Sequence, residues 1–178
     1  RPKKTPHAAI LTIGDELLCG HTVNTNAAEI ARLAGWAGVQ VVRSISLPDD
    51  RRVIAESVKT SREAVVFVTG GLGPTSDDLT AEALGRAYRE KMVFHEAQAA
   101  RIREFFRIRG RTPVDVNFRQ AWIPEGFRVL ENDWGTAPCL VHDAVDGRPL
   151  LFAMPGVPRE MRSLMTERVL PEIRRRFG

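Results

Sequence analysis

The residues with the clearest chemistry form a glycine-rich stretch that runs directly into carboxylates and hydroxyls. Residues 69–80 read TGGLGPTSDDLT. Three glycines in four positions permit positive φ angles and leave no side chains between the backbone and a ligand. Backbone N–H groups at a helix start bind anions, but Asp77 and Asp78 repel an anion unless a cation lies between. The stretch therefore predicts a phosphate bound together with a divalent metal ion.

A plainer interpretation of the same stretch is a tight connection between a strand and a helix. The apolar residues 64–68 predict a buried strand, and residues 81–88 predict a helix. Thr75, Ser76 and Asp77 are good candidates for the N-cap of that helix. Since glycine loops alone are common in proteins, this motif by itself leaves both interpretations open.

Three other polar turns follow predicted strands. The apolar run 8–13 leads into Gly14, Asp15 and Glu16, and the predicted strand 150–154 leads into a turn at 155–160. The strand 39–46 is followed by two aspartates, of which one should cap the helix 51–61 and the other is left free for chemistry. Because open α/β sheets bind ligands beyond the carboxyl ends of their parallel strands, we expect these turns to converge.

The remaining elements complete an α/β pattern. A helix is predicted over 27–33 with Asn26 as its N-cap, and another over 95–109 with Gly110 as its end. Residues 113–117 should be a loop, followed by short extended pieces at 120–126 and 127–130. Adjacent strands 139–142 and 150–154, joined by a hairpin with its tip at 146–147, make the sheet mixed.

The final helix should open at Pro158 and kink or break at Pro171. Its methionines and aliphatic residues predict a buried stripe. Trp122 and Trp134 are interpreted as packing residues, because aromatic side chains are chiefly core material.

The composition limits the class of protein. With 178 residues, 43% hydrophobic and 27% charged, the chain predicts one domain over 1–178. No apolar run approaches a membrane span, and the basic start is followed by only a short apolar strand, so neither a membrane segment nor a secretory signal is expected. Cys19 and Cys139 form no metal or disulfide pattern, which predicts reduced thiols in a cytoplasmic protein.

The net charge and the absence of certain motifs limit the classes of binding partner. A net charge of +4 favours anionic ligands, while the arginine clusters 101–111 and 174–176 lie on predicted helices as solvated faces. The sequence has no zinc-finger spacing or aromatic RNA-binding signature, so nucleic acid is not expected as a partner. The absence of a Walker lysine and of a dinucleotide fingerprint disfavours a P-loop kinase or an oxidoreductase.

Four motifs in a fixed order carry a resemblance to a known family. They are Gly14–Leu18 with Asn24 and Asn26, the stretch 69–80, the segment 117–138 that ends in NDWGTAP, and the turn 155–161. Together they resemble the amino-terminal domain of CinA (competence/damage-inducible) proteins, within the wider MoaB/Mog molybdopterin-binding family. The resemblance implies a three-layer α/β/α fold with a mixed, mostly parallel sheet, and a homo-oligomer, either a dimer or a trimer.

The family implies two chemistries at one site. CinA-type relatives hydrolyse the pyrophosphate bond of ADP-ribose or similar dinucleotides with a divalent metal, and Mog-type relatives adenylylate molybdopterin with ATP and magnesium. The aspartates of the Mog-type site match Asp49 and Asp78. A third hypothesis is a module that binds a nucleotide or a pterin phosphate without turning it over. The chain departs from the family in having Cys139 where glycine is usual. The amidase domain of full-length CinA is not expected within residues 1–178.

The leading hypothesis is a metal-dependent pyrophosphatase with Mg²⁺ or a similar ion, and molybdopterin is the alternative ligand. The candidate catalytic residues are Asp49, Asp77 and Asp78, of which Asp77 and Asp78 hold the metal. The candidate ligand-binding residues are Gly14, Asp15, Glu16, Asn24, Asn26, Thr69, Gly70, Gly71, Gly73, Pro74, Thr75, Thr80, Gly135, Thr136, Pro155, Gly156 and Glu160.

Overall fold

A six-stranded sheet forms the centre of the computed structural model, which describes residues 4–178. Residues 1–3 of the predicted domain, with half of its basic start, lie outside the described residues. The strand order is β2-β1-β3-β8-β7-β6. The parallel strands are β1 (His7–Ile13), β2 (Gln40–Leu47), β3 (Val65–Thr69) and β8 (Leu150–Met154). The antiparallel pairs are β8 with β7 (Cys139–His142) and β7 with β6 (Arg128–Leu130), which confirms a mixed, mostly parallel sheet.

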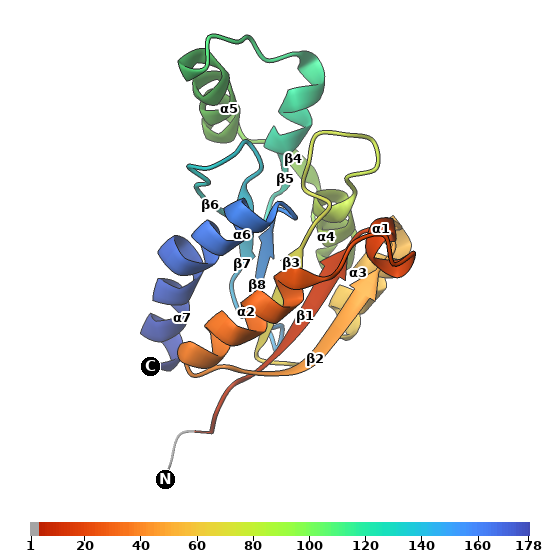
Figure 1. Cartoon of the computed structure of the whole chain (residues 1–178), viewed down its shortest axis with the longest axis vertical. Helices are drawn as coiled ribbons and strands as arrows, with labels where there is room; N and C mark the ends of the chain where they lie inside the picture. The colour runs from red at the N-terminus through yellow and green to blue at the C-terminus, as the bar shows by residue number, and fades with distance from the viewer. Residues whose placement is uncertain (1–3) are drawn as a thin grey trace.

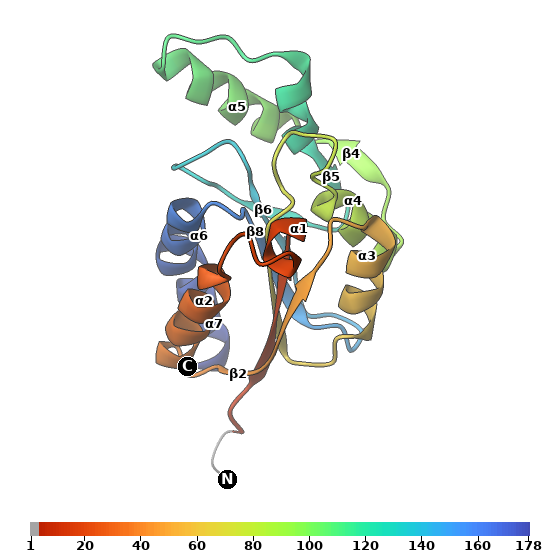
Figure 2. The ribbon, with the colours of Figure 1, turned by 45° about the vertical axis from the view of Figure 1, so that its right-hand side comes forward.

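Helices cover both faces of this sheet (Figures 1 and 2). One face packs against α2 (Thr25–Trp36), α6 (Pro158–Leu164) and α7 (Leu170–Phe177). The other face packs against α3 (Arg51–Thr60) and α4 (Thr80–Tyr88). Because both faces are covered, every residue of β3 is buried and the strand is apolar without alternation. The predicted three-layer α/β/α fold is confirmed.

A lobe that we call the cap, residues 92–124, lies beyond the carboxyl ends of the parallel strands (Figure 1). It contains β4 (Met92–Phe94), α5 (Glu96–Ile108), the 3₁₀ helix η1 (Asp115–Ala121) and β5 (Trp122–Pro124). The loop predicted at 113–117 and the extended piece at 120–126 are only partly correct. The Asn117 Oδ1 accepts the Val114 N–H at 2.8 Å and opens the 3₁₀ helix, so only residues 122–124 are extended.

Two helix starts differ from their predictions. The side chain of Asn24 caps α2 by accepting the Ala27 N–H at 3.1 Å, so the prediction of Asn26 as N-cap is wrong. The helix α4 begins only at Thr80, after a cap residue without a side-chain bond, so none of the three predicted residues at 75–77 caps it. The prediction for α3 is confirmed, since Asp50 accepts the Val53 N–H at 2.9 Å and Asp49 takes no part in the cap.

The carboxyl-terminal half contains the predicted hairpin and a helical irregularity. Asp146 and Gly147 have positive φ angles of 51° and 74° at the turn between β7 and β8, as the tip of a hairpin requires. The last helix runs from α6 through a wider π-helical turn, η2 (Met165–Val169), into α7. Pro171 follows this wide turn at the start of α7, and the chain continues as helix across it, so the helix does not break there. Among residues 4–178, no helix combines the length and the apolar character needed to cross a membrane.

Thr80 joins the start of α4 to the end of β3. Its side chain is fully buried and its hydroxyl donates to the Gly70 carbonyl at 2.7 Å. We expect Thr80→Val to lower the free energy of unfolding by about 1–2 kcal/mol, because the shape is kept while a buried carbonyl loses its donor. Urea denaturation measures this change.

The matched control is Thr166→Val. The Thr166 hydroxyl also donates to a carbonyl, that of Arg162 at 3.0 Å, but on the exposed side of its own helix. Loss of this exposed hydrogen bond should change the free energy of unfolding by less than about 0.5 kcal/mol. Equal effects of the two substitutions would contradict the structural role given to Thr80.

Candidate active site

The glycine loop, residues 70–79, connects β3 to α4 at the carboxyl edge of the sheet. Gly70 and Gly71 have φ angles of 101° and 70°, which residues with a Cβ atom rarely adopt. A Cβ on Gly70 would collide with the carbonyl oxygen of Ile13, and one on Gly71 would collide with the Thr80 hydroxyl. The loop therefore needs glycine at both positions in order to lie against the end of β1.

The second half of the loop closes on itself through Asp78. Its Oδ2 accepts the backbone N–H of Thr75 at 2.9 Å and the Thr75 hydroxyl at 2.7 Å. The sequence predicted that backbone N–H groups of this stretch form an anion cradle. The Thr75 N–H already donates to Asp78, and the Gly70 N–H already donates to the Met154 carbonyl at 3.0 Å. The N–H groups of residues 71–73 donate to no described residue, so the free part of the cradle is confined to them.

A cavity of about 440 Å³ opens beside this loop. Its walls come from the ends of β1, β2, β3 and β8 and from the turn before β7, as expected for loops at the carboxyl edge of parallel strands. The structure thus brings together most of the residues proposed from the sequence: Gly14, Glu16, Asp49, Gly70, Gly71, Gly73, Pro74, Asp77, Asp78, Thr136, Pro155, Gly156 and Glu160.

The remaining candidates lie behind or beside the cavity wall and support it. Asn24 caps α2, Thr75 holds Asp78, and Thr80 holds the Gly70 carbonyl. The buried Asn26 donates to the Thr69 hydroxyl at 3.2 Å and to the Gly156 carbonyl at 2.9 Å, which ties the start of α2 to the ends of β3 and β8.

Asp15 and Asp49 hold each other's backbones. The Asp15 N–H donates to Asp49 Oδ2 at 3.1 Å, and the Asp49 N–H donates to Asp15 Oδ1 at 3.0 Å. This reciprocal pair joins the short helix α1 (Asp15–Leu18) to the turn after β2. Burial raises the pKa of Asp49, and the negative charges of Asp15, Glu16 and Asp78 add to the rise, while the hydrogen bond from Asp15 opposes it.

Glu160 reaches the same cavity from the first turn of α6. Burial raises the pKa of its carboxyl group, against the hydrogen bond that Asn132 Nδ2 donates to it at 3.3 Å. Gly135 lies directly against this carboxylate, and a Cβ there would overlap Glu160 Oε1. Glycine at this position therefore lets the Glu160 carboxylate lie where it does, and a larger residue would displace it.

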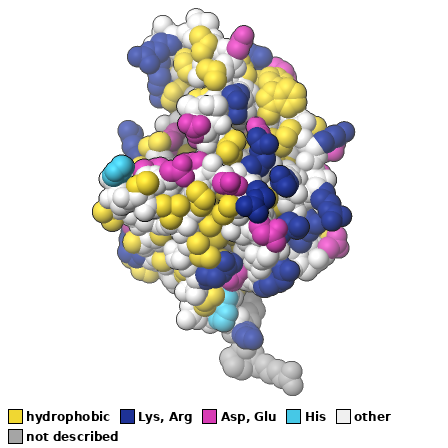
Figure 3. Space-filling view, turned by 90° about the vertical axis from the view of Figure 1, so that its right-hand side faces the viewer, with side chains coloured by type: hydrophobic (Ala, Val, Ile, Leu, Met, Phe, Trp, Pro, Cys, Tyr) yellow, Lys and Arg dark blue, Asp and Glu magenta, His cyan; other side chains and the backbone are white. Residues whose placement is uncertain are grey.

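The cavity wall carries an uncompensated negative charge. Glu16, Asp49, Asp77, Asp78 and Glu160 line it, and none of them forms an ion pair with a residue in the part of the chain that the structure describes. No lysine or arginine within 4–178 lines the cavity. Figure 3 shows acidic side chains gathered across this side of the molecule, below the lobe that contains α5. An anionic ligand would bind here only together with a cation.

The carboxylates of this cavity suit a hard divalent cation that keeps some water or phosphate oxygens among its ligands. Within residues 4–178, no three His, Cys, Asp or Glu side chains are placed to hold a metal ion by themselves. Mg²⁺ commonly binds through one or two carboxylates together with ligand phosphate oxygens and water, so a complete protein cage is not needed. The metal site at Asp77 and Asp78 stays a prediction, and Asp49 lines the same cavity.

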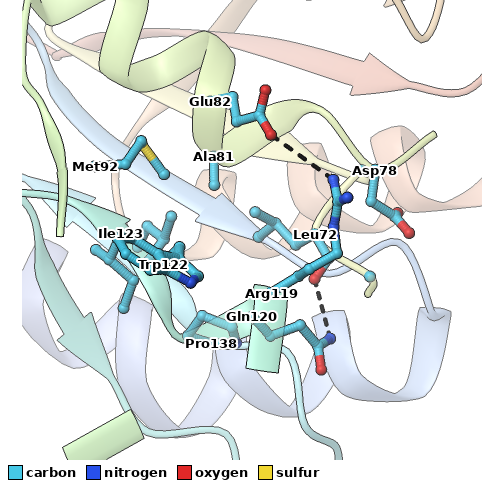
Figure 4. A pocket seen from close by; sticks show the side chains of 13 residues that line it. Leu72, Asp78, Ala81, Glu82, Met92, Arg119, Gln120, Trp122, Ile123 and Pro138 are labelled. Atoms are coloured by element: carbon cyan, nitrogen blue, oxygen red, sulfur yellow. Dashed lines mark hydrogen bonds and ion pairs between the residues drawn. The ribbon is translucent and has the colours of Figure 1, made fainter. Parts of the chain in front are cut away.

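Sequence reasoning did not identify Gln120 as a site residue. It comes from the cap, and its Nε2 donates to the Leu72 carbonyl at 3.1 Å inside the cavity wall. No local pattern marks it, because its contact depends on how the cap folds back over a loop 48 residues earlier in the chain. Trp122 packs edge-on against Phe94, with ring centroids 5.6 Å apart, but it is 48% exposed and also lines a second cavity (Figure 4), so it is not a core residue.

Cys139, the departure from the family pattern, does not narrow the site. Its side chain is buried in the core cluster beneath α2, α6 and α7, and it lines neither cavity. Burial raises the pKa of its thiol well above the ordinary value, so the thiol stays protonated.

The comparisons with known proteins place the chain in a family. A family model described as "Probable molybdopterin binding domain" matches residues 9–175. The chain belongs to this family. Its CinA resemblance is also confirmed. CinA-like proteins of Dictyoglomus thermophilum and of Geobacter sp. strain M21 are 40% and 44% identical over 164 and 172 residues, which are 91% and 95% of this chain. The chain spans only 39% and 41% of their lengths.

Solved structures give the same result for the fold. The crystal structure of the protein CinA from Thermoplasma acidophilum, described as of unknown function, aligns with a TM-score of 0.85 and 34% identity, over 95% of this chain and 98% of that one. The molybdopterin biosynthesis enzyme MoaB from Thermus thermophilus aligns with a TM-score of 0.58 and 20% identity, over 95% of this chain and 96% of that one. The second likeness supports the fold alone. The predicted homo-oligomer stays a prediction.

The raised pKa of Glu160 makes a prediction about stability. A carboxyl group whose pKa is higher in the folded than in the unfolded state favours folding at low pH, and that contribution is lost as the pH rises through the folded pKa. Glutamine cannot ionise, so Glu160→Gln removes the loss of stability that ionisation of Glu160 causes. We therefore expect the stability of the variant relative to the parent to increase as the pH rises from the ordinary pKa of glutamate toward neutral, measured by urea denaturation at each pH.

Glu63→Gln supplies a control of opposite sign. Its hydrogen bond from Arg43 lowers the pKa of Glu63 to about 2, so its contribution to stability is present at neutral pH and lost as the pH falls toward that value. This variant should lose stability relative to the parent at neutral pH. The assignment for Glu160 fails if both variants shift in the same direction.

Proposed function

We propose that the chain is a metal-dependent hydrolase of the pyrophosphate bond in ADP-ribose or a similar dinucleotide. One observation carries the proposal: the cavity is lined by residues 71–73, whose N–H groups donate to no described residue, and by five carboxylates that form no ion pair within residues 4–178. The N–H groups favour an anion, and the carboxylates favour a cation. A diphosphate with its divalent metal satisfies both, whereas neither component alone does.

The carboxylates divide into two roles in this proposal. Asp77 and Asp78 hold the divalent ion, which when bound neutralises charge on the diphosphate oxygens. Asp49 orients a water molecule and accepts its proton, and the raised pKa of Asp49 makes it a better proton acceptor than an ordinary aspartate. The water oxygen bonds to one phosphorus atom while the bond from that phosphorus to the bridging oxygen breaks. The products are AMP and ribose 5-phosphate.

The family supports a second candidate at the same cavity. The matching model is named for molybdopterin binding, and structural neighbours are named as molybdopterin biosynthesis proteins. Adenylyl transfer to a pterin phosphate also acts on a phosphorus atom beside adenosine and needs the same charge neutralisation. This alternative differs in requiring ATP and a pterin acceptor, and in producing no ribose 5-phosphate.

The two neighbouring aspartates after β2 give a sharp test. Asp49 lines the cavity, and Asp50 caps α3. We expect Asp49→Asn to lower the rate of AMP release from ADP-ribose with Mg²⁺ by about 100-fold or more, because the proton acceptor is lost. Asp50→Asn should leave the rate within about twofold, since asparagine is an equally good N-cap. Chromatography of the nucleotide products measures both rates.

Further variants and ligands separate the alternatives. Asp78→Asn should also abolish AMP release, and removal of the divalent metal by a chelator should do the same to the parent. The hydrolase proposal would be sunk if the parent released no more AMP than Asp78→Asn. Stabilisation against heat by ADP-ribose without any product would indicate a binding module. Transfer of AMP from ATP to a pterin phosphate would indicate the adenylylation chemistry.

A further inference from the structure

A cavity of about 200 Å³ lies at the amino edge of the sheet, between the carboxyl ends of α3 and α4 and the turn that joins β7 to β8. Figure 2 shows this turn beside the lower end of α3. We call it the basic cavity, because Lys59, Arg62, Arg89 and Arg148 line it. The parallel strands β3 and β8 begin beside it and end at the carboxylate-lined cavity, so the two cavities lie at opposite ends of the same strands.

The positive charge of this cavity is unmatched. No described Asp or Glu lines it. Arg62, Arg89 and Arg148 form no ion pair within residues 4–178. Lys59 reaches Glu56, but at 3.9 Å and with both side chains more than half exposed, and such a surface pair contributes little. The cavity therefore attracts an anion by its own charge.

The carboxylates that lie nearest along the chain do not supply the missing negative charge. Glu63 accepts two hydrogen bonds from Arg43, from Nε at 2.7 Å and from Nη2 at 3.0 Å. Asp143 forms an equivalent pair with Arg128. Asp146 lies at the tip of the turn and does not line the cavity. The fold thus holds like charges together here, at a cost that a bound anion would remove.

Helix dipoles account for only part of this cluster. Lys59 lies in the last turn of α3, and Arg89 is the C-cap residue of α4. The carboxyl end of a helix carries about half a negative charge, so two helix ends offset about one of the four positive charges. Arg148 lies on the turn between β7 and β8, outside either helix. The excess of positive charge remains after the helix ends are counted.

Two of the guanidinium groups are held against the cavity wall. Arg62 Nη1 donates to the carbonyls of Lys59 at 2.7 Å and of Ser61 at 2.9 Å, while its Nε and Nη2 donate to no described residue. The guanidinium carbon of Arg148 lies 4.8 Å from the centre of the Tyr88 ring, and Tyr88 also lines the cavity. Planar guanidinium groups with free N–H donors match pairs of phosphate oxygens, and a fixed position reduces the entropy lost on binding.

We propose that the basic cavity binds a small phosphate-bearing anion without a metal ion, through the guanidinium groups of Arg62, Arg89 and Arg148. Its volume is below the about 300–1,000 Å³ of pockets for drug-sized ligands. The cavity therefore suits inorganic phosphate or diphosphate, or the phosphate end of a larger molecule. This site is separate from the carboxylate-lined cavity and does not depend on the proposed hydrolase.

The two cavities should differ in their need for a metal ion. We expect calorimetric titration of the parent protein with pyrophosphate in EDTA to show saturable binding with a Kd below about 1 mM. Asp78→Asn should leave this binding within about twofold, because Asp78 does not line the basic cavity and distant sites act independently. Loss of the metal-free binding in Asp78→Asn would place the anion in the carboxylate-lined cavity and overturn the proposal.

Two substitutions test the cations of the cavity. Arg148→Gln and Arg89→Gln should each weaken the metal-free binding of pyrophosphate by about tenfold, because each removes a charged hydrogen-bond donor. Arg148→Lys keeps the charge but loses the planar pair of donors, so it should recover only part of the affinity. Melting temperatures without ligand show which variants are folded, and either glutamine variant suffices for the test.

Arg175→Gln is the matched control. It removes the same charge from an exposed arginine of α7, which forms no ion pair within the described residues and does not line the basic cavity. Its affinity for pyrophosphate should stay within about twofold of the parent. Equal weakening by Arg175→Gln and Arg148→Gln would show that net charge alone attracts the anion, which overturns the site.

Two further titrations in EDTA, with inorganic phosphate and with ribose 5-phosphate, identify the source of the phosphate. Tighter binding of pyrophosphate or phosphate than of ribose 5-phosphate supports a free inorganic anion. Tighter binding of ribose 5-phosphate, weakened by Arg148→Gln, supports the phosphate end of an organic molecule. Absence of binding by all three anions overturns the site. A protein that binds them in this way but releases no AMP from ADP-ribose contradicts the hydrolase alone.

Discussion

The close approach of three backbone segments at Gly70 is the constraint on which the site depends. Gly70 lies against the carbonyl of Ile13 at the end of β1, and a Cβ on Gly156 would lie 3.2 Å from the Gly70 Cα. The turns that follow β1, β3 and β8 are therefore in contact through their backbones. Because no side chain separates them, the carboxylates that each turn carries converge on one cavity.

This convergence has an electrostatic consequence. Acidic groups that would be well separated on an extended chain face one another across a partly buried space, and the pKa values of Asp49 and Glu160 rise mainly because burial disfavours their charged forms. The structure keeps them together through local bonds, such as the Asp15 and Asp49 backbone pair and the hydrogen bond from Asn132. The folded state of the described residues thus holds these carboxylates together without a cationic side chain in the cavity wall, and folding already includes the cost of bringing like charges close.

The sequence predicted the layers, the mixed sheet and the convergence of the strand-end turns, because each follows from apolar runs and from the geometry of parallel strands. It was wrong where the deciding partner lies far along the chain. Asn24 and Asn26 are equivalent cap candidates locally, and the choice is made by Thr69 and Gly156, which bind the Asn26 amide. Gln120 could not be identified, since its role arises from a contact between the cap and Leu72.

The π-helical turn at 165–169 sets the rotational phase of the last helix. It contains one more residue per hydrogen-bonded turn than an α-helix, and Ile173 beyond it faces the same core as Met161 and Leu164 before it. Because the wide turn absorbs this extra residue, loss of one residue from it would restore an α-helical turn and leave Ile173 facing the core. The exposed arginines at 174–176 would keep their outward positions, whereas loss of one residue from an ordinary α-helical turn would rotate the helix beyond it by about 100°.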